Sequence, residues 1–366
     1  MPAIWLIDAY RAGERGQVRA LAEALSKALD WPCRRIELEY RSHVVLPHVL
    51  GRSSIAGITP TAAGQLAPPW PDLVITCGVR NEPVCRWIRE QSGGQSRYLH
   101  LGRPWGPLDS FDLVVTTPQY RVPERDNVVN NELTLHAVDG ARLAAERERW
   151  TAEFASLPRP LVTVNVGGDS GPYTLGPKAA LRLAREASAL AAREGGSLLV
   201  STSSRTAPAV ADILERSIDV PSRVYRWRRD DPDNPYLGML AHADSLVVTA
   251  DSIAMLSEAC ATGKPVFMFD LGGMRKEVEV DRDFRWGGFF YGVLMRWFWQ
   301  RLSRDISLVH RRLAATGRAS WLGDDAATRA TTAGDTDMDR SIAAVRGLFA
   351  DAGDPVHLDS EGGPVL

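Results

Sequence analysis

Continuous apolar runs, each the length of a single strand, constrain the fold of this chain more than any other feature. "DLVITC" spans 72–77, "FDLVVTTP" spans 111–118 and "SLVVT" spans 245–249. Runs of this kind, bounded by turn residues and lacking strict alternation, suit parallel strands that are buried on both faces. Helical patterns lie between the runs almost throughout the chain. The sequence therefore predicts an α/β fold with doubly wound, Rossmann-like parallel sheets.

The length and one proline-rich stretch predict two such sheets in separate domains. The 366 residues exceed what one hydrophobic core usually serves. "LPRP" at 157–160 follows a charged helical stretch, and the strand-then-helix pattern restarts after it. We therefore expect an N-terminal α/β domain over 1–157, a C-terminal α/β domain over 158–350 and a disordered tail over 351–366. The two domains would face each other across a cleft, with ligands at the carboxyl ends of their strands.

Composition argues against several classes of function. The net charge of −2 gives no electrostatic reason to expect binding to nucleic acid. The cysteines lack C-x-x-C spacing and the histidines lack metal-site spacing, so we expect reduced thiols and no protein-built metal site. The first residues do not form a signal peptide, and no apolar stretch reaches roughly 18 residues. We expect a cytoplasmic protein, with peripheral contact at the inner face of the cell membrane left open.

The stretch "TADSIAMLSEACATGKP" at 249–265 predicts a helix between two strands. At about 100° per residue, the apolar face comprises Ile253, Leu256 and Cys260. The opposite face comprises Asp251, Met255, Glu258 and Thr262. We expect Asp251 or Ser252 to cap the N-terminus of this helix, and Gly263 to take the left-handed position after its last turn.

This helix allows two interpretations. It is either a plain amphipathic helix with a solvated acidic face or one wall of a ligand site. Its position after a buried strand favours the second, because the free amides and positive dipole of a helix N-terminus suit a diphosphate. Glu258, two turns along, is then placed to accept hydrogen bonds from a ribose diol.

Two loops are expected at the same edge of the sheet. The glycines of "VGGDS" at 166–170 allow a phosphate or sugar to approach the backbone, although a strand-to-helix turn alone can require glycine. In "STSSRT" at 201–206, Arg205 is placed to clamp a phosphate. Neither a G-x-G-x-x-G nor a P-loop motif occurs. The candidate binding residues here are Gly167, Gly168, Asp169, Ser170, Ser203, Ser204, Arg205 and Thr249.

"LSEACATGKPV" at 256–266, which follows a strand and a serine-containing turn, resembles the nucleotide-sugar motif of two-domain GT-B glycosyltransferases. In those enzymes a glutamate at this position holds the ribose, and the preceding turn and helix N-terminus hold the diphosphate. The resemblance implies the ribose role for Glu258. It implies that Asp251, Ser252 and Met255 line the diphosphate site.

Over residues 3–272 the chain resembles the mitochondrial fission Elm-type family. The motifs that carry this resemblance are "GERGQ" at 13–17, "PDLVITCGVR" at 71–80, "FDLVV" at 111–115, "NVGGDS" at 165–170, "SSRT" at 203–206, "NPYLGMLAHAD" at 234–244 and "VTADSIAMLSEACATGKP" at 248–265. The resemblance implies a GT-B-like fold and chemistry on nucleotide-sugars.

The first loop departs from the family pattern. Many members carry a histidine where this chain has Glu14, and many have two arginines where it has Ser204 and Arg205. A first-loop side chain often serves as the base in GT-B enzymes, so the candidate catalytic residues are Glu14 and, deeper, Asp8. A surface glutamate is the alternative. We expect the cleft to be faced by Arg11, Gly13, Glu14 and Gln17.

The segment 287–318 combines aromatic and basic residues. Residues 289–299 are almost entirely apolar and aromatic, too few to span a bilayer. Six arginines follow between 296 and 318. This pattern predicts either an interfacial helix on an anionic membrane or a helix that packs against the first domain.

Several aspartates occur in Asp-x-Asp spacing, which can hold a metal on a diphosphate. They are Asp231 and Asp233, Asp281 and Asp283, and Asp335, Asp337 and Asp339. None directly follows a buried strand, so we expect solvated acids, with the first pair capping a helix that begins near Tyr236.

These observations predict a membrane-associated, metal-independent glycosyltransferase of GT-B type. Its donor would be a nucleotide-sugar, with no other cofactor, and its acceptor would be membrane-associated or lipid-linked. A nucleotide-sugar epimerase and a non-catalytic GT-B scaffold that acts as a membrane adaptor remain as alternatives. The sugar, the nucleotide and the acceptor stay open.

Overall fold

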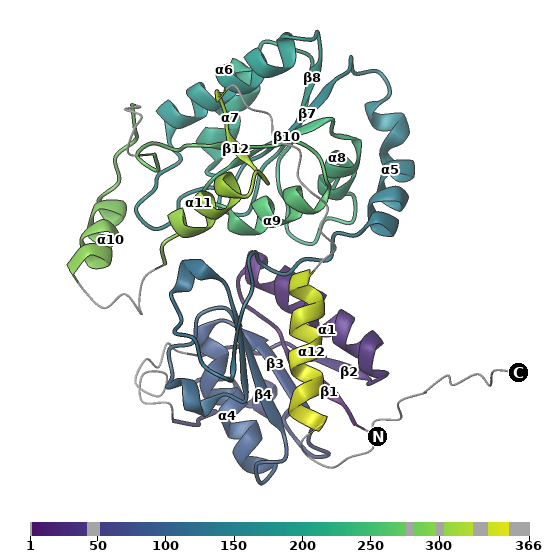
Figure 1. Cartoon of the computed structure of the whole chain (residues 1–366), viewed down its shortest axis with the longest axis vertical. Helices are drawn as coiled ribbons and strands as arrows, with labels where there is room; N and C mark the ends of the chain where they lie inside the picture. Colours follow the sequence, from purple (N-terminus) through teal and green to yellow (C-terminus); the bar gives the residue numbers. More distant parts are fainter. Residues whose placement is uncertain (1, 42–51, 276–280, 298–303, 325–335, 351–366) are drawn as a thin grey trace, which may run out of the picture.

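The computed structural model describes residues 2–41, 52–275, 281–297, 304–324 and 336–350. In these ranges the chain forms two parallel six-stranded sheets with helices around them, one above the other in Figure 1. The predicted α/β, GT-B-like class with two doubly wound sheets is confirmed. The tail expected over 351–366 lies outside the described residues.

The first sheet has the strand order β2-β1-β3-β4-β5-β6. Its strands are β1 (Ile4–Ile7), β2 (Cys33–Ile36), β3 (Leu73–Cys77), β4 (Arg97–Leu101), β5 (Leu113–Thr116) and β6 (Val128–Asn130). Between them lie α1 (Ala12–Leu29), α3 (Pro60–Ala63), α4 (Glu82–Gln91), and the short 3-10 turns η1 (Val79–Asn81), η2 (Leu108–Ser110) and η3 (Pro118–Tyr120). All residues of β3 and β5 are buried, as their continuous apolar sequences predict.

The second sheet has the order β12-β11-β10-β7-β8-β9. Its strands are β7 (Leu161–Asn165), β8 (Ser197–Ser201), β9 (Ser222–Tyr225), β10 (Ser245–Thr249), β11 (Val266–Phe269) and β12 (Ser320–Trp321). The helices of this half are α5 (Gly140–Phe154), α6 (Pro177–Ala192), α7 (Pro208–Ser217), α8 (Tyr236–His242), α9 (Ile253–Ala261), α10 (Trp286–Trp297) and α11 (Ser307–Ala315). The last described helix is α12 (Thr336–Ala350).

Each sheet has a point at which the winding reverses. In the first sheet β2 lies on one side of β1 and β3 on the other. In the second, β8 lies on one side of β7 and β10 on the other. A crevice opens outside the carboxyl ends of the strands at such a point, and ligands of doubly wound sheets bind there. The topology therefore directs attention to the loops after β1 and β3, and after β7 and β10.

The predicted domain boundary assigns α5 to the first sheet and α12 to the second, but each of these helices packs on the other sheet. Phe154 of α5 is buried with Leu161, Leu199 and Met239 of the second half, although α5 falls within 1–157. Val345 of α12 is buried in the core of the first sheet, although it falls within 158–350. Figure 1 shows α5 along the upper half and α12 over the lower half. The apolar side of α5 packs on the second half, so the proline-rich stretch at 157–160 follows a helix that already belongs to that half.

The two halves are joined by hydrogen bonds from the segment that leaves β6. The Thr134 amide and hydroxyl donate to Ser257 Oγ on α9, at 3.1 and 2.8 Å. The Asp337 carboxylate at the start of α12, which packs on the first sheet, accepts from the amides of Glu132 and Leu133 at 3.0 and 2.9 Å, and so holds the same segment to the first half. α9 is thus fixed to the first half at Ser257, in the middle of the helix.

Candidate active site

The glycine loop after β7 lies directly against the residues that follow β10. The Gly167 amide donates to Thr249 Oγ1 at 2.7 Å, and the Gly168 amide donates to Asp251 Oδ2 at 3.0 Å. A Cβ at Gly167 would stand 2.3 Å from Asp251 Oδ2, and one at Gly168 would stand 2.2 Å from the Arg205 carbonyl oxygen. Glycine is therefore required at both positions for close packing of three loops.

Asp251 and Arg205 form an ion pair at the centre of this arrangement. Arg205 Nη2 lies 2.7 Å from Asp251 Oδ2, and Asp251 is fully buried. Arg205 Nη1 also donates to the carbonyl oxygens of Gly168 and Asp169, at 3.3 and 3.1 Å. The guanidinium is still about a third exposed, so a ligand can reach it. The arginine expected to clamp a phosphate is therefore held at the strand ends by a buried carboxylate.

The N-terminus of α9 differs from the expected capping. Ser252 is the N-cap residue but its side chain makes no capping hydrogen bond. Asp251 does not cap the helix, because its carboxylate turns toward Gly168 and Arg205. Gly263 has φ +70°, as expected for the residue that follows the helix. The first turn of α9 therefore begins without a side-chain cap.

Glu258 faces away from the core stripe of α9. Its Oε2 accepts a hydrogen bond from the Tyr236 hydroxyl at the start of α8. Burial raises the pKa of Glu258 to about 7, although the Tyr236 hydrogen bond and the charge of Arg142 both act to lower it. Met255, one turn earlier, is partly buried against the core. The Glu258 carboxyl, with a pKa of about 7, therefore titrates near neutral pH, and the Tyr236 hydroxyl is its hydrogen-bond partner.

The serine loop after β8 supports the glycine loop. Ser203 Oγ and Thr206 Oγ1 donate to the Gly167 carbonyl oxygen, at 3.0 and 2.6 Å. Ser204 is exposed. Thr206 was not among the predicted site residues, although its place in the same loop could have suggested it. Ser203 and Thr206 thus position backbone, which leaves Arg205 and Ser204 as the side chains of this loop that can meet a ligand.

Asp169 and Ser170 continue from the glycine loop toward α10 and α11. Asp169 accepts from the Leu175 amide at 2.9 Å and pairs with Arg285 at 3.1 Å. Ser170 Oγ accepts from the guanidinium of Arg304, which precedes α11. The structure therefore brings the end of "VGGDS" against the segment that leads back to the first half, a contact that sequence reasoning did not identify.

On the first sheet, Glu14 lies at the β1–β3 switch point. Its Oε1 is 3.5 Å from Arg11 Nη1, and its buried Oε2 has no hydrogen-bond partner among the described residues. A Cβ at Gly78, which follows β3, would stand 2.9 Å from that Oε2. Burial raises the pKa of Glu14, and the charges of Arg11, Arg304 and Arg103 partly offset this. Glu14 is therefore a partly buried carboxylate with one buried oxygen that has no partner among the described residues, unlike an ordinary surface glutamate.

Asp8, the deeper candidate base, is occupied by other groups. Its Oδ2 accepts from Arg19 and lies 3.0 Å from Arg35 Nε on β2, and its Oδ1 accepts from the Ala9 amide. Both oxygens of this carboxylate are therefore engaged, and two guanidiniums stabilise its charge. This geometry favours a structural role for Asp8, in joining β1 to α1 and β2.

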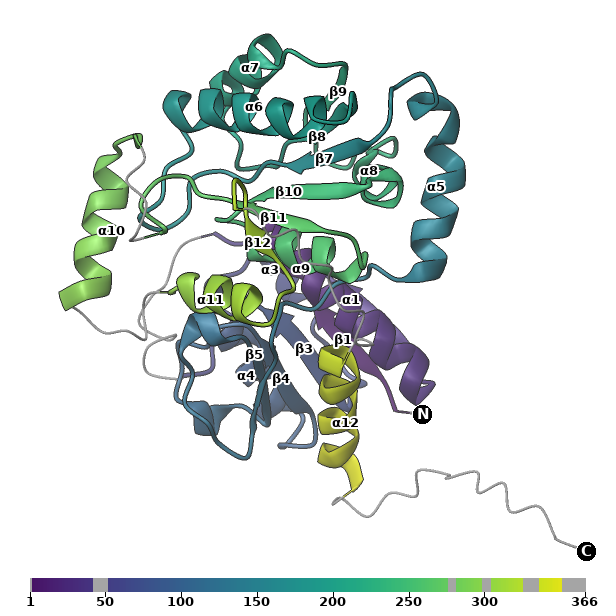
Figure 2. The ribbon, with the colours of Figure 1, turned by 45° about the horizontal axis from the view of Figure 1, so that its top comes forward.

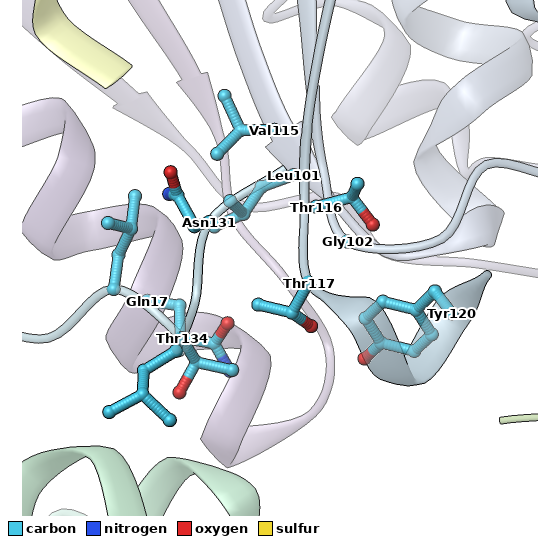
Figure 3. Close-up of a pocket in the computed structure, with 11 residues that line it drawn as sticks. Gln17, Leu101, Gly102, Val115, Thr116, Thr117, Tyr120, Asn131 and Thr134 are labelled. Carbon is cyan, nitrogen blue, oxygen red and sulfur yellow. The ribbon is translucent and has the colours of Figure 1, made fainter. Parts of the chain in front are cut away.

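A small pocket lies between the carboxyl ends of β4 and β5 and the segment that leads to α9. Figure 3 shows Gln17, Thr117, Tyr120 and Thr134 around it. Gln17 also donates to the Gly13 carbonyl oxygen, which fixes the exposed first turn of α1. Thr116 and Thr117 end the "FDLVVTTP" run, so the rule that places ligands after buried strands could have identified them.

The aspartate pairs take structural roles. Asp231 binds Tyr225, Arg228 and the Asp233 amide, and it is Asn234 that accepts from the Tyr236 amide at the start of α8. The expected capping by Asp231 and Asp233 is therefore wrong.

The other spaced aspartates are not simply solvated acids. Asp281 pairs with Lys178, and the Asp283 carboxylate accepts from three amides at the start of α6. Asp337 holds the segment after β6, and Asp335 lies outside the described residues. Across the described ranges, no group of three His, Cys, Asp or Glu side chains is arranged to hold a metal ion.

The family follows from the sequence as a whole. A family model described as mitochondrial fission ELM1 matches residues 12–283, which is most of the chain. The chain belongs to the mitochondrial fission ELM1 family. The ELM1 protein of Arabidopsis thaliana is 31% identical over 238 residues, which cover 59% of this chain. The matched part spans 55% of the plant protein, just over half of its length.

Other relatives extend the comparison. An uncharacterised protein of Rickettsia prowazekii is 24% identical over 297 residues, covering 73% of this ELM1-family chain and 82% of its own. Among solved structures, Staphylococcus aureus MnaA with UDP has a TM-score of 0.49 at 12% identity, covering 99% of this chain and 100% of MnaA. Escherichia coli ADP-heptose LPS heptosyltransferase II has a TM-score of 0.44 at 10% identity, covering 96% and 99%. Both scores lie below 0.5, so membership of the ELM1 family rests on the sequence match.

Glu258→Gln should remove one component of the pH dependence of stability. Because the pKa of Glu258 is raised from 4.5 to about 7, the native state binds a proton that the unfolded chain has released between these pH values. The stability that Glu258 contributes is therefore lost as the pH rises from 4.5 to about 7, and the variant lacks this contribution. Between pH 5 and 8 we expect the wild-type free energy of unfolding to fall by on the order of 2–3 kcal/mol relative to the variant, as measured by urea denaturation.

The matched control is Glu148→Gln, at an exposed position on α5. This control should follow the wild-type pH profile. Parallel profiles for wild type and Glu258→Gln would contradict the raised pKa.

Proposed function

We propose that this protein is a glycosyltransferase that takes a nucleotide-sugar at the second sheet and an acceptor at the first. The observation that carries the proposal is the arrangement at the β7–β10 switch point. Three features lie together there: the N-terminus of α9 without a side-chain cap, the close-packed glycine loop, and Arg205. Further along α9 lies the half-buried Glu258. Each part matches one part of a nucleoside diphosphate.

The diphosphate would lie at the first turn of α9. Amides at the N-terminus of a helix and the helix dipole both favour an anion. Ser252 and Met255 would line this site, and Arg205, held in place by Asp251, would supply a positive charge. Asp251 itself would stabilise the arginine and not contact the phosphate, since its carboxylate is buried and negative.

The ribose would bind at Glu258. A carboxylate accepts hydrogen bonds from both hydroxyls of a diol, and such charge-assisted bonds are stronger than neutral ones. In the free protein the Tyr236 hydroxyl occupies Glu258 Oε2, so it takes the place of one ribose hydroxyl. Because a charged carboxylate is the better acceptor, nucleotide binding should favour deprotonation of Glu258.

Transfer would then require a base on the acceptor side, and Glu14 is the candidate. Glu14 would accept the proton of the acceptor hydroxyl while the hydroxyl oxygen forms a bond to the anomeric carbon. The bond from that carbon to the diphosphate breaks, and the nucleoside diphosphate leaves with the electron pair. The free, buried Oε2 and raised pKa of Glu14 suit this role. In this scheme the arginines and helix amides, without a metal, stabilise the leaving group.

The acceptor is proposed to be membrane-associated, because α10 presents aromatic rings to solvent. Phe284, Trp286, Phe289 and Phe290 are 54–68% exposed and contact one another edge-on or tilted. Figures 1 and 2 both show α10 standing at one edge, away from the two sheets. Among the described helices none is long and apolar enough to cross a membrane. Exposed aromatic rings suit the interface of a lipid bilayer, and the arginines of segment 287–318 favour an anionic one, so an anionic lipid surface is the partner whose chemistry fits.

Binding of a nucleoside diphosphate should depend on Glu258. We expect UDP, GDP or ADP at 100 times its dissociation constant to stabilise the wild type by about 2.7 kcal/mol in a thermal-shift experiment. Glu258→Ala should lose most of this stabilisation, whereas Glu194→Ala, at an exposed turn after α6, should keep it. If no nucleotide stabilises the wild type at saturating concentration, the transferase and epimerase hypotheses both fail and a scaffold remains.

Catalysis should depend on Glu14 without a matching effect on donor binding. Glu14→Gln should lower sugar transfer from a nucleotide-sugar to a membrane extract by roughly 10²- to 10⁴-fold, because the base is lost. Nucleotide stabilisation of this variant should stay at the wild-type level. Glu23→Gln, at an exposed position of the same helix α1, is the control. Conversion of the nucleotide-sugar without any acceptor would instead identify an epimerase.

Membrane contact should depend on the aromatic rings of α10. In co-sedimentation with vesicles that contain about a third anionic phosphatidylserine, Trp286→Ser with Phe290→Ser should reduce the bound fraction at least several-fold. Leu181→Ser removes an exposed apolar side chain from α6 and should leave binding unchanged. Equal sedimentation of the double variant and the wild type would contradict the membrane proposal.

A further inference from the structure

Three arginines converge on Glu14 at the junction of the two halves, and we call them the junction arginines. They are Arg11, Arg103 and Arg304, which come from the loop after β1, the loop after β4 and the segment before α11. Arg11 lies 3.5 Å from Glu14, and all three are close enough for their charges to act on that carboxylate. Three positive charges therefore act on one negative charge.

Arg103 is the most constrained of the three. Its loop is fixed by Glu82, whose carboxylate accepts from the amides of Trp105 and Gly106 at 2.8 and 2.9 Å. The neighbouring Gly102 packs close to Tyr120, and both line the pocket beside Gln17. Arg103 Nη1 is buried and has no hydrogen-bond partner within the described parts of the chain. The fixed loop therefore holds Arg103 with its Nη1 group available to donate a hydrogen bond to a ligand.

Arg304 connects this cluster to the glycine loop of the second half. Its guanidinium donates to Ser170 Oγ, and its amide donates to Tyr291 Oη at 3.1 Å. The Tyr291 ring lies against Gly171, where a Cβ would be 3.1 Å from it. Arg304 therefore stands between the donor side and Glu14.

Among the described residues, the acidic group next to Arg304 in sequence does not offset this excess of positive charge. The nearby Asp305 pairs with Arg121 and accepts from the Ser307 hydroxyl and amide, so it is engaged elsewhere. Burial lowers the pKa of Arg103, and the charges of Arg304 and Arg11 add to that effect. Guanidinium groups that lie near one another repel, and a bound anion stabilises them. The planar guanidinium can donate two parallel hydrogen bonds to phosphate oxygens, so phosphate is an anion that suits this cluster.

We propose that the junction arginines bind a phosphate group carried by the acceptor, which places the acceptor hydroxyl beside Glu14. This inference rests on the proposed function, since it assigns the acceptor of the same reaction. The acceptor side is favoured over the donor because Arg11 and Arg103 belong to loops of the first sheet, and Gly102, next to Arg103, lines the pocket of that sheet. The donor diphosphate has its own arginine, Arg205, on the second sheet.

The test compares ligands that differ by a phosphate. Isothermal titration of the full chain, with and without saturating UDP, would use farnesyl phosphate, farnesol and glycerol 3-phosphate. We expect farnesyl phosphate to bind at least tenfold more tightly than farnesol. Binding of farnesyl phosphate alone would indicate a lipid phosphate, and binding of glycerol 3-phosphate as well would indicate that the phosphate group suffices. Both outcomes support the proposal.

Arg103→Gln should weaken binding of the phosphate ligand by roughly tenfold to a hundredfold, because a charge-assisted hydrogen bond is lost. Arg103→Lys keeps the charge but not the planar guanidinium, so its affinity for the phosphate ligand should lie between those of the wild type and Arg103→Gln. Arg304→Gln should show the same loss of affinity, and it serves as the test if Arg103→Gln folds poorly. Arg125→Gln, an exposed arginine of the first half, is the control. Nucleoside diphosphate binding should stay within twofold of wild type for all of these variants.

Three results would overturn the proposal. Farnesyl phosphate binding no more tightly than farnesol would remove the phosphate site. Unchanged binding in both Arg103→Gln and Arg304→Gln would remove the arginines. A loss of UDP binding in Arg103→Gln as large as that in Glu258→Ala would assign the cluster to the donor. If phosphate ligands bind but no nucleotide does, the proposed transferase fails while the anion site stands, so the two failures are distinguishable.

Discussion

Parallel pairing of strands is the constraint on which the rest of this structure depends. In both described sheets every neighbouring pair of strands is parallel, so the carboxyl ends of each sheet lie along one edge. The return of the chain past β7 to form β10 creates the crevice, and α9 begins inside it. The same reversal at β1 and β3 brings Glu14 next to Gly78. Two separate switch points thus concentrate the polar residues of both halves at their junction.

α9 joins these two switch points physically. Leu256 and Cys260 bury one side of it in the second core, and Ser257 receives two hydrogen bonds from Thr134 of the first half. Glu258 lies next to Ser257 in the helix but faces Tyr236. A ligand that displaces Tyr236 would act on a helix already attached to the acceptor side. The proposed donor and acceptor sites are therefore mechanically linked through a single short helix.

The sequence was sufficient to predict the buried strands β3, β5 and β10 and to group the candidate loops at one edge of a sheet. Continuous apolar runs indicate buried parallel strands, and parallel strands determine where loops meet, so Gly167, Arg205 and Asp251 could be grouped from the sequence alone. The pairing of Asp251 with Arg205 was not predictable, because the direction of a side chain at a helix start depends on tertiary contacts. A cap and an ion pair use the same residue type at the same position. The roles of Asp8 and Arg304 were hidden for a similar reason, since their partners are distant in sequence.

The central claim is that a nucleoside diphosphate binds at the β7–β10 switch point with its ribose on Glu258. A crystal structure of the protein with UDP tests it most directly. The account predicts the diphosphate at the first turn of α9, within reach of Arg205, and ribose hydroxyls on Glu258 in place of the Tyr236 hydroxyl. UDP bound elsewhere, with the Tyr236–Glu258 hydrogen bond intact, would contradict it.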